Sequence, residues 1–412
     1  MKYSPVEIIN VGLIFDQDKI PVGRLALQNR KIFFEYDDDF ISSGLEISPY
    51  SFPLKRGVQS VDLPFFDGLP GVFHDSLPDG WGRLILDRAL RARNISPENL
   101  SSLDRLAHVG RSGMGALVYE PDYKNKPEEK DFPSLDDLAT QAQKILEGET
   151  GDVLEELVSL NGSSSGARPK ALIGVRNDKS KIVHGVYDLE EGFDHWLVKF
   201  PNMADGMDSG AIEFVYAQMA KEAGLEMEET YLFPGTKSPG FFGTKRFDRI
   251  GNKRLHLHTA AGILHSNFRQ PALDYKDLIK LTLFLTKDMG EAEKMFRLAV
   301  FNVLSHNRDD HGKNFSYLMT SKGQWGLSPA YDLIYSSGPG GEQSTMVAGE
   351  GANPGTKHLL ELAKGASISA KSAQNIIDQC RAALSGWKHL SKAAGVSKDK
   401  ITEIDCVLSS KK

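Results

Sequence analysis

A strongly polar segment, residues 306–314, separates two apolar stretches of the chain and constrains the fold more than any other feature. It reads His-Asn-Arg-Asp-Asp-His-Gly-Lys-Asn. The residues before it, Lys294 to Ser305, are apolar nearly all round, which is typical of a helix buried in the core of a lobe. The sequence therefore predicts that a buried helix ends in a polar loop.

An antiparallel hairpin is predicted directly after the polar segment. Residues 315–319 alternate between apolar and polar positions, as half-buried strands do, and residues 325–331 supply a second run. Lys322-Gly323 fits a tight turn between the two runs. Helix, loop and hairpin together make one continuous unit.

The expected register of this hairpin brings two potential magnesium ligands together. If the hairpin closes at Lys322-Gly323, facing residue numbers sum to 645, so Asn314 faces Tyr331 and Asp332 faces Lys313. Directly opposed residues lie about 4.5 to 5.5 Å apart at their α-carbons. We therefore expect Asn314 and Asp332 to be close enough to share one metal ion.

An Asp followed by an Asn and then by a second Asp is how phosphotransferases place one base and two magnesium ligands. Asp309 begins the loop, where a carboxylate can take a proton from an attacking hydroxyl. A turn rich in Asp, Asn and Gly is the simpler alternative. A metal site at His306 and His311 is another, although that spacing does not share a helical face and no third ligand is nearby. The agreement of helix, loop, hairpin and Asp332 favours phosphotransfer.

Composition excludes several classes of protein. The chain has 412 residues, enough for two or three domains, and a net charge of -6, which does not favour direct binding to nucleic acid. Its two cysteines, Cys380 and Cys406, indicate no disulfide framework and fit a reducing compartment. The sequence shows neither an apolar signal core nor an uninterrupted span of membrane length. We therefore expect a cytoplasmic protein.

The chain divides into a front domain and a larger second part. Three short strand-like runs lie between residues 6 and 36, and a helical stretch follows at residues 80–93. A polar, charged segment at residues 124–136 resembles a linker. We place an α/β domain at residues 1–145 and a second domain at residues 146–412, with lobes at about 146–250 and 251–412.

A small-residue loop, Asn161 to Lys170, leads into a predicted strand at residues 171–175. Such loops bring backbone N–H groups against phosphate oxygens, so this one is a candidate to cover ATP. It does not have the spacing of a Walker motif. On its own, a loop of this composition is more often a flexible Gly/Ser turn.

Two further segments are candidates for a nucleotide site. Lys199 ends an apolar strand, as the lysine that holds ATP phosphates does in kinases, although it also fits a strand-end charge. Glu213 begins a predicted helix at residues 212–223, where it can pair with Lys199 or favour the helix dipole. Residues 246–249, Arg-Phe-Asp-Arg, lie between the presumed lobes, and Phe247 is a candidate to pack near adenine.

Taken together, these segments resemble the HipA family of bacterial serine/threonine kinases, the toxins of type II toxin-antitoxin pairs. The resemblance spans most of the chain. It is most specific in residues 307–315, Asn-Arg-Asp-Asp-His-Gly-Lys-Asn-Phe. The other matching segments are residues 65–70 (Phe-Phe-Asp-Gly-Leu-Pro), 76–83 (Ser-Leu-Pro-Asp-Gly-Trp-Gly-Arg) and 110–116 (Gly-Arg-Ser-Gly-Met-Gly-Ala).

The resemblance implies a role for each candidate residue. Asp309 is then the catalytic base, Asn314 and Asp332 hold magnesium, and Ser163 is the autophosphorylated serine whose modification expels the loop and inactivates the kinase. The implied ATP-binding residues are Ser165, Gly166, Ala167, Arg168, Pro169, Lys170, Lys199, Lys245, Arg246, Phe247, His311, Gly312, Lys313, Asn314, Tyr331 and Asp332.

The sequence departs from the family pattern in two places and from the eukaryotic kinase pattern in one. Three consecutive serines, residues 163–165, leave the phosphorylated position open. Lys245 occupies a hinge position where an acidic residue is common in the family. Asp332 is followed by Leu-Ile rather than Phe-Gly, so control through the serine loop is expected rather than the activation-segment control of eukaryotic kinases.

The resemblance implies an α+β, two-lobed protein-kinase-like fold with an added N-terminal domain and a mainly helical C-terminal lobe. It implies a serine/threonine kinase that uses ATP and magnesium, pairs with a HipB-like helix-turn-helix antitoxin and reaches operator DNA through that antitoxin. An aminoacyl-tRNA synthetase, notably glutamyl-tRNA synthetase, is the implied substrate.

Two other functions stay open. A lipid or small-molecule kinase is one, because the loop also resembles that of phosphoinositide kinases, although no basic amphipathic segment suits a membrane surface. The other is a catalytically silent corepressor that only holds its antitoxin. The presence of Lys199, Asp309, Asn314 and Asp332 together argues against a silent protein.

Overall fold

The N-terminal part of the chain forms an antiparallel sheet with one covered face. The computed structural model describes residues 4–124, 132–148, 153–161, 166–202, 206–270 and 272–410. Strands β1 (Ile8–Ile14), β2 (Lys19–Gln28), β3 (Lys31–Tyr36) and β4 (Leu117–Glu120) pair in the order β3-β2-β1-β4. The three strands expected between residues 6 and 36 are therefore present. Helices α1 (Asp38–Ser43), α2 (Gly71–His74) and α4 (Ser102–Val109) share the apolar core of this sheet.

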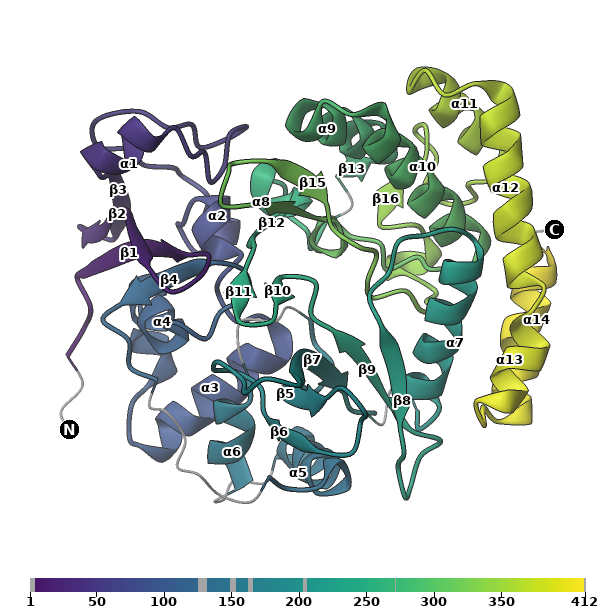
Figure 1. Ribbon diagram of the computed structural model, residues 1–412, viewed down its shortest axis with the longest axis horizontal. Helices are drawn as coiled ribbons and strands as arrows, with labels where there is room; N and C mark the ends of the chain where they lie inside the picture. The colour runs from purple at the N-terminus through teal and green to yellow at the C-terminus, as the bar shows by residue number, and fades with distance from the viewer. Residues whose placement is uncertain are drawn as a thin grey trace.

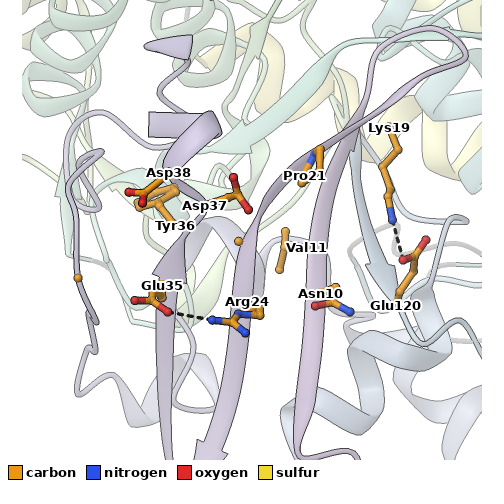
Figure 2. A pocket seen from close by; sticks show the side chains of 12 residues that line it. Asn10, Val11, Lys19, Pro21, Arg24, Glu35, Tyr36, Asp37, Asp38 and Glu120 are labelled. Atoms are coloured by element: carbon orange, nitrogen blue, oxygen red, sulfur yellow. Dashed lines mark hydrogen bonds and ion pairs between the residues drawn. The ribbon is translucent and has the colours of Figure 1, made fainter. Parts of the chain in front are cut away.

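The outer face of the same sheet carries a polar cavity of about 520 Å³ (Figure 2). A cross-strand row formed by Glu120, Asn10, Arg24 and Glu35 crosses all four strands. Arg24 pairs with Glu35 at 3.2 Å, and Lys19 pairs with Glu120 at 2.6 Å. The residues that line this cavity include none of the candidates from the sequence.

A second antiparallel sheet forms the middle of the molecule (Figure 1). Its five strands pair in the order β6-β5-β7-β9-β8. They are β5 (Lys170–Arg176), β6 (Ile182–His184), β7 (Phe193–Lys199), β8 (Thr230–Phe233) and β9 (Phe241–Lys245). Helix α7 (Ser209–Glu222) packs against β8 and β9, and on another side against α12 and α13. Helices α3 (Gly80–Ala92), α5 (Leu135–Glu147) and α6 (Val153–Ser159) belong to the core of this sheet.

The C-terminal part is mainly helical, as the sequence predicts, and its last helices lie on the right in Figure 1. The predicted buried helix is α10 (Met289–Leu304), and the polar segment follows it. The other helices are α8 (Ala260–Ile263), α9 (Tyr275–Thr286), α11 (Thr356–Gly365), α12 (Ala370–Leu384), α13 (Trp387–Ala393) and α14 (Lys398–Ser410). Single 3₁₀ turns form at Pro64–Phe66, Pro97–Asn99, Gly312–Asn314 and Pro339–Gly341.

Short strands complete this part of the chain. Strands β12 (His256–Thr259), β14 (Ser316–Met319) and β15 (Trp325–Leu327) form a sheet in the order β12-β14-β15. Strand β10 (Arg249–Ile250) pairs with β11 (Lys253–Arg254), and β13 (Leu273–Asp274) pairs with β16 (Thr345–Met346). No helix in the described ranges combines the length and the apolarity that crossing a bilayer requires.

The predicted hairpin forms, but its predicted register is wrong by one residue. Tyr317 pairs with Leu327 and Met319 with Trp325, so facing numbers sum to 644 instead of 645. The Thr320 N–H donates to the Gln324 carbonyl at 3.0 Å, which makes the loop three residues long with Gly323 at φ 75°. A three-residue hairpin loop takes a residue with positive φ at this position, and glycine supplies it. Strand pairing ends at Leu327, so the predicted strand pairs Asn314–Tyr331 and Lys313–Asp332 do not form.

The N-terminal part packs tightly on both other parts. Trp81 and Ile85 of α3 share a core with the five-stranded sheet, and Met319 of the hairpin lies in the core of the N-terminal sheet. Gly71 meets Gly262 so closely that a Cβ on Gly71 would lie 2.0 Å from the Gly262 carbonyl oxygen. A domain division near residue 145 therefore runs through a shared core.

Candidate functional site

Asn314 stabilises the polar loop that follows α10 through two hydrogen bonds within the loop. The Asn314 Nδ2 donates to the Asp309 carbonyl at 2.7 Å, and the Asn314 N–H donates to the His311 carbonyl at 2.8 Å. These bonds close the loop over a short distance, and the Asp309 side chain is exposed. The Asn314 amide oxygen takes no part in them. The loop can thus present one carboxylate and one amide oxygen to a ligand.

The next residue of the loop with a carboxylate, Asp310, points inward and was missed by the sequence reasoning. It is fully buried and accepts hydrogen bonds from the Tyr275 hydroxyl at 2.6 Å, the Gln343 Nε2 at 3.0 Å and the Thr345 N–H at 3.1 Å. Burial raises the pKa of Asp310 to about 7, because all three donors are uncharged. Asp310 therefore anchors the loop to the protein interior, whereas the Asp309 side chain lies on the surface of the loop.

Tyr331 connects the end of the hairpin to the polar loop. Its hydroxyl donates to the Lys313 carbonyl at 2.6 Å and lies 2.6 Å from the Ser316 hydroxyl. Asp332, the next residue, has φ 57°, a conformation that is rare for residues other than glycine. Backbone strain of this kind is concentrated at functional sites. Asp332 lies beyond the end of β15, in this strained turn.

Asp332 meets Lys199 and Glu213, and we call these three residues the site cluster. The Lys199 Nζ lies 2.6 Å from the Glu213 Oε1 and also donates to the Asp332 carboxylate. The structure thus forms the Lys199–Glu213 pair that the sequence left open. Side-chain exposure is 4% for Glu213 and 12% for Lys199 but 34% for Asp332. Glu213 and Lys199 are thus largely shielded from solvent, whereas Asp332 is partly accessible to a ligand.

Electrostatics keep this cluster charged. Burial alone would raise the pKa of Asp332, but attraction by Lys199, Arg168 and Lys170 lowers it below its usual range. Burial would lower the pKa of Lys199, and its two carboxylate partners raise it. Burial raises the pKa of Glu213. Three cations from two segments thus converge on Asp332, which is a suitable place for phosphate groups.

The described end of the small-residue loop supplies two of these cations. Lys170, at the start of β5, is buried, and its pKa falls to about 8 because of burial and the nearby Lys199. Gly166 lies so close that a Cβ there would be 2.6 Å from the Lys170 Nζ. The loop residues Gly166, Ala167, Arg168 and Pro169 precede this strand without interruption. Ser163 and Ser165 lie outside the described residues.

The three candidates for the adenine hinge, Lys245, Arg246 and Phe247, differ in where their side chains point. The Lys245 Nζ lies 2.8 Å from the Asp194 Oδ2, and Arg246 directs its guanidinium to Asp248, so neither side chain is directed at the site cluster. The Phe247 ring lies 5.3 Å from the Tyr331 ring. Of the three, Phe247 is the side chain that the structure brings next to the polar loop. Lys245 and Arg246 can contribute through their backbone.

Of the remaining loop candidates, Lys313 contacts the N-terminal part, whereas His311 packs within the C-terminal part. The His311 ring lies 5.9 Å from the Phe268 ring, and Gly312 begins the 3₁₀ turn. The Lys313 Nζ lies 3.2 Å from the Asp79 Oδ2 and 4.2 Å from the Phe268 ring centre. Asp79 was missed as a site residue, although it belongs to the segment 76–83 that carries part of the family resemblance.

The residues present suit magnesium better than zinc. Within the described ranges, no group of three or more His, Cys, Asp and Glu side chains could hold a metal ion, so the His306–His311 alternative finds no third ligand. Magnesium is bound through one or two carboxylates together with substrate phosphates and water. The Asn314 amide oxygen and the exposed edge of Asp332 fit that pattern.

Comparison with known proteins covers nearly the whole chain. Residues 162–387 match the HipA-like C-terminal domain and residues 15–120 match the HipA N-terminal domain. The putative kinase Y4dM of Sinorhizobium fredii is 26% identical over 336 residues, which cover 76% of this chain and 74% of that protein. The serine/threonine-protein kinase toxin HipA of Shewanella oneidensis is 22% identical over 326 residues, covering 73% and 69%.

The fold has a counterpart among solved structures. A complex of Shewanella oneidensis HipA with HipB and operator DNA contains a chain that superposes with a TM-score of 0.68 at 16% identity. The superposition covers 97% of this chain and 95% of that chain. The expected α+β, two-lobed, kinase-like architecture with an added N-terminal part is therefore confirmed.

Proposed function

Because this chain belongs to the HipA family, we propose that it is an ATP-dependent serine/threonine protein kinase. The observation that supports this most is the site cluster. Lys199 of β7, Glu213 of α7 and Asp332 beyond the hairpin come from three distant segments and meet beside one polar loop. A lysine held by a helix glutamate and facing a metal-binding aspartate is the arrangement that protein kinases use.

In this proposal each residue has one task. Asn314 and Asp332 would hold a magnesium ion, which would neutralise charge on the phosphates of ATP, the donor of the phosphoryl group. The Lys199 ammonium exchanges its contact with Asp332 for the phosphates of ATP and stays paired with Glu213. The exposed Asp309 accepts the proton of the acceptor hydroxyl. Positioning and charge neutralisation provide the catalysis, without a covalent enzyme intermediate.

We further propose that the protein is the toxin of a type II toxin-antitoxin pair. Two relatives support this: the Shewanella oneidensis toxin, and its complex with HipB and operator DNA. The partner is then a HipB-like antitoxin, and operator DNA is reached mainly through it, in keeping with the net charge of -6. An aminoacyl-tRNA synthetase as substrate, self-inactivation at Ser163 and a cytoplasmic location belong to the same proposal.

Phosphate transfer from labelled ATP tests the proposal. Purified protein is incubated with magnesium, γ-labelled ATP, a mixture of aminoacyl-tRNA synthetases and, separately, phosphoinositide vesicles. We expect label on protein, and we expect Asp309→Asn to lower it by about 10³-fold or more, because the base is lost. Asp18→Asn, in an exposed turn of the N-terminal sheet, is the matched control and should transfer normally.

The same assay separates the alternatives. Label on lipid and none on protein would indicate the lipid-kinase alternative. Equal labelling by wild type and Asp309→Asn, or none by either, would contradict the kinase proposal and favour a silent corepressor.

A further inference from the structure

The first turn of α3 reaches into the middle of the molecule. Asp79 caps this helix by accepting from the Gly80 N–H at 2.8 Å. The Trp81 N–H donates to the Gly166 carbonyl at 3.1 Å, and the Trp81 Nε1 donates to the Lys170 carbonyl at 3.2 Å. The N-terminal part therefore makes two hydrogen bonds to the described end of the phosphate-loop candidate.

The contact leaves no room for a larger residue. Gly80 has φ 44°, and a Cβ on it would lie 2.6 Å from the Gly166 carbonyl oxygen and 2.7 Å from the Ala167 Cα. Those atoms belong to backbone, which cannot move aside as a flexible side chain would. The close approach fixes the distance between α3 and residues 166–170.

The same turn also touches the catalytic-loop candidate. The Asp79 Oδ2 lies 3.2 Å from the Lys313 Nζ, and its Oδ1 lies 3.4 Å from the Arg269 Nη2. The Lys313 side chain is 2% exposed and lies over the Phe268 ring. Burying an ammonium is costly unless an anion is close. Asp79 is the carboxylate that forms this ion pair with Lys313.

One turn thus contacts segments of both lobes. Residues 166–170 lead into the five-stranded sheet, while Lys313 immediately precedes Asn314 in the C-terminal part. A displacement of Lys313 shifts its neighbour Asn314, and the Tyr331 hydroxyl bound to the Lys313 carbonyl would shift with it. The position of Asp332, next to Tyr331, depends on the same bond.

We propose that Asp79 is a positioning residue for phosphotransfer, which acts through Lys313 and joins the catalytic loop to the phosphate loop by way of the first turn of α3. The inference rests on the proposed function. It makes the N-terminal domain a built-in part of the kinase site. Asp79 itself touches no reacting atom.

A double-mutant cycle tests this inference. Wild type, Asp79→Asn, Lys313→Met and the double variant are compared in steady-state phosphate transfer. We expect Asp79→Asn to lower kcat by about 10- to 10²-fold, because small displacements of catalytic groups have effects of this size. The KM for ATP should change by less than about threefold, since transition-state alignment is lost rather than nucleotide contacts. The double variant should be no slower than Lys313→Met.

Matched variants separate position from general damage. Asp67→Asn removes a half-exposed carboxylate that pairs at 3.2 Å with Arg83 of α3. This variant should keep the kcat of wild type. Asp79→Glu keeps the charge but moves the carboxylate, so it should retain part of the activity that Asp79→Asn loses. If Asp79→Asn does not fold, an unchanged kcat in Asp79→Glu would still overturn the inference.

Hydrogen exchange supplies a readout that does not depend on activity. We expect the amides of residues 166–170 and 312–314 to exchange faster in Asp79→Asn than in wild type or Asp67→Asn. An active wild type with an unchanged kcat in Asp79→Asn, or with multiplying losses in the double variant, would overturn the role of Asp79 alone. A wild type that transfers no phosphate would contradict the proposed function, and unchanged exchange at both segments would then reject the link between the loops.

Discussion

The site cluster and a second ionic cluster, both within the described part of the chain, are built differently. In the site cluster, Lys199 bridges Glu213 and an Asp332 that is 34% exposed. In the second, which we call the hinge cluster, Asp248 is 0% exposed and receives Arg246 at 2.9 and 2.7 Å and Arg249 at 2.7 Å. The Gly115 N–H adds a fourth donor to Asp248 at 2.6 Å.

The difference in exposure distinguishes charged groups that a ligand can reach from charged groups that only stabilise the fold. Every oxygen of Asp248 is occupied by fixed donors, and the Arg249 guanidinium also donates to the Gly115 and Gly113 carbonyls at 3.0 and 3.1 Å. The hinge cluster therefore joins the segment 110–116 permanently to the chain between the lobes. The site cluster has an open edge, so a ligand can take over one of its partners. We expect damage to the first to affect stability and damage to the second to affect activity.

The largest expected effect is on activity, from Asp332→Ala. We expect kcat/KM to fall by about 10³-fold or more, because a metal ligand and a partner of Lys199 are lost together. The midpoint of urea unfolding should stay close to wild type, since Lys199 keeps Glu213 as its buried partner. Activity within tenfold of wild type would contradict this role.

The next largest effect is on stability, from Asp248→Asn. Removing the carboxylate leaves Arg246 and Arg249 buried together without a full anion, and breaking a buried pair costs about 3 to 5 kcal/mol. Urea unfolding measures this loss. Asp194→Asn, a more exposed acid that pairs with Lys245 near the same segment, is the control and should change stability little. Equal stability of both variants would remove the contrast between the clusters.

Asp310 sharpens the comparison because it is as buried as Asp248, but its described donors, on Tyr275, Gln343 and Thr345, are uncharged. The pKa of Asp248 is lowered, since the pull of Arg246 and Arg249 exceeds the effect of burial. Burial raises the pKa of Asp310 from its ordinary value of 3.8 to about 7. Its contribution to stability is therefore present below pH of about 4 and is lost as the pH rises toward 7.

Unfolding at a series of pH values checks this sign. Between pH of about 4 and 7, the stability of wild type should fall relative to Asp310→Asn by at most about 1.4 kcal/mol per pH unit, the limit for one proton. Above pH 7 the difference should level off. A difference that is flat over the whole range would show that Asp310 does not titrate there.

The smallest effect is expected at Lys245. Its ammonium pairs with Asp194, and the two side chains are 29% and 23% exposed. Partly exposed pairs of this kind contribute about 0.2 to 1 kcal/mol. We expect Lys245→Ala to change the KM for ATP by less than about twofold, because its ammonium is paired with Asp194 and is not directed at the site cluster. A tenfold rise in KM would assign the side chain a direct contact.

Much of this site was predictable because it rests on local patterns. The apolar run before residue 306 specifies α10, alternation specifies the hairpin, and the strand that ends at Lys199 is read in the same way. The spacing of Asp309 and Asn314 lies within one loop, so it survives any error in tertiary structure. The domain division near residue 145 stays a prediction, with α3 packed across it.

What could not be predicted depends on contacts between distant segments. Hairpin loops of two and of three residues both fit Lys322-Gly323, and the length of the loop shifts the strand register by one residue. Two consecutive acids, Asp309 and Asp310, look equivalent until Tyr275 and Gln343 show which one is buried. The same holds for Asp79, whose partner Lys313 is far away in the chain.

In the proposed function, Asn314 and Asp332 hold the metal of a bound nucleotide. A structure of the protein with manganese and a non-hydrolysable ATP analogue, read by anomalous scattering, tests this directly. We predict one manganese peak in contact with the Asn314 amide oxygen and the Asp332 carboxylate, with the Lys199 Nζ transferred from Asp332 to the phosphates. A manganese ion bound away from both residues, with Lys199 still on Asp332, would contradict the account.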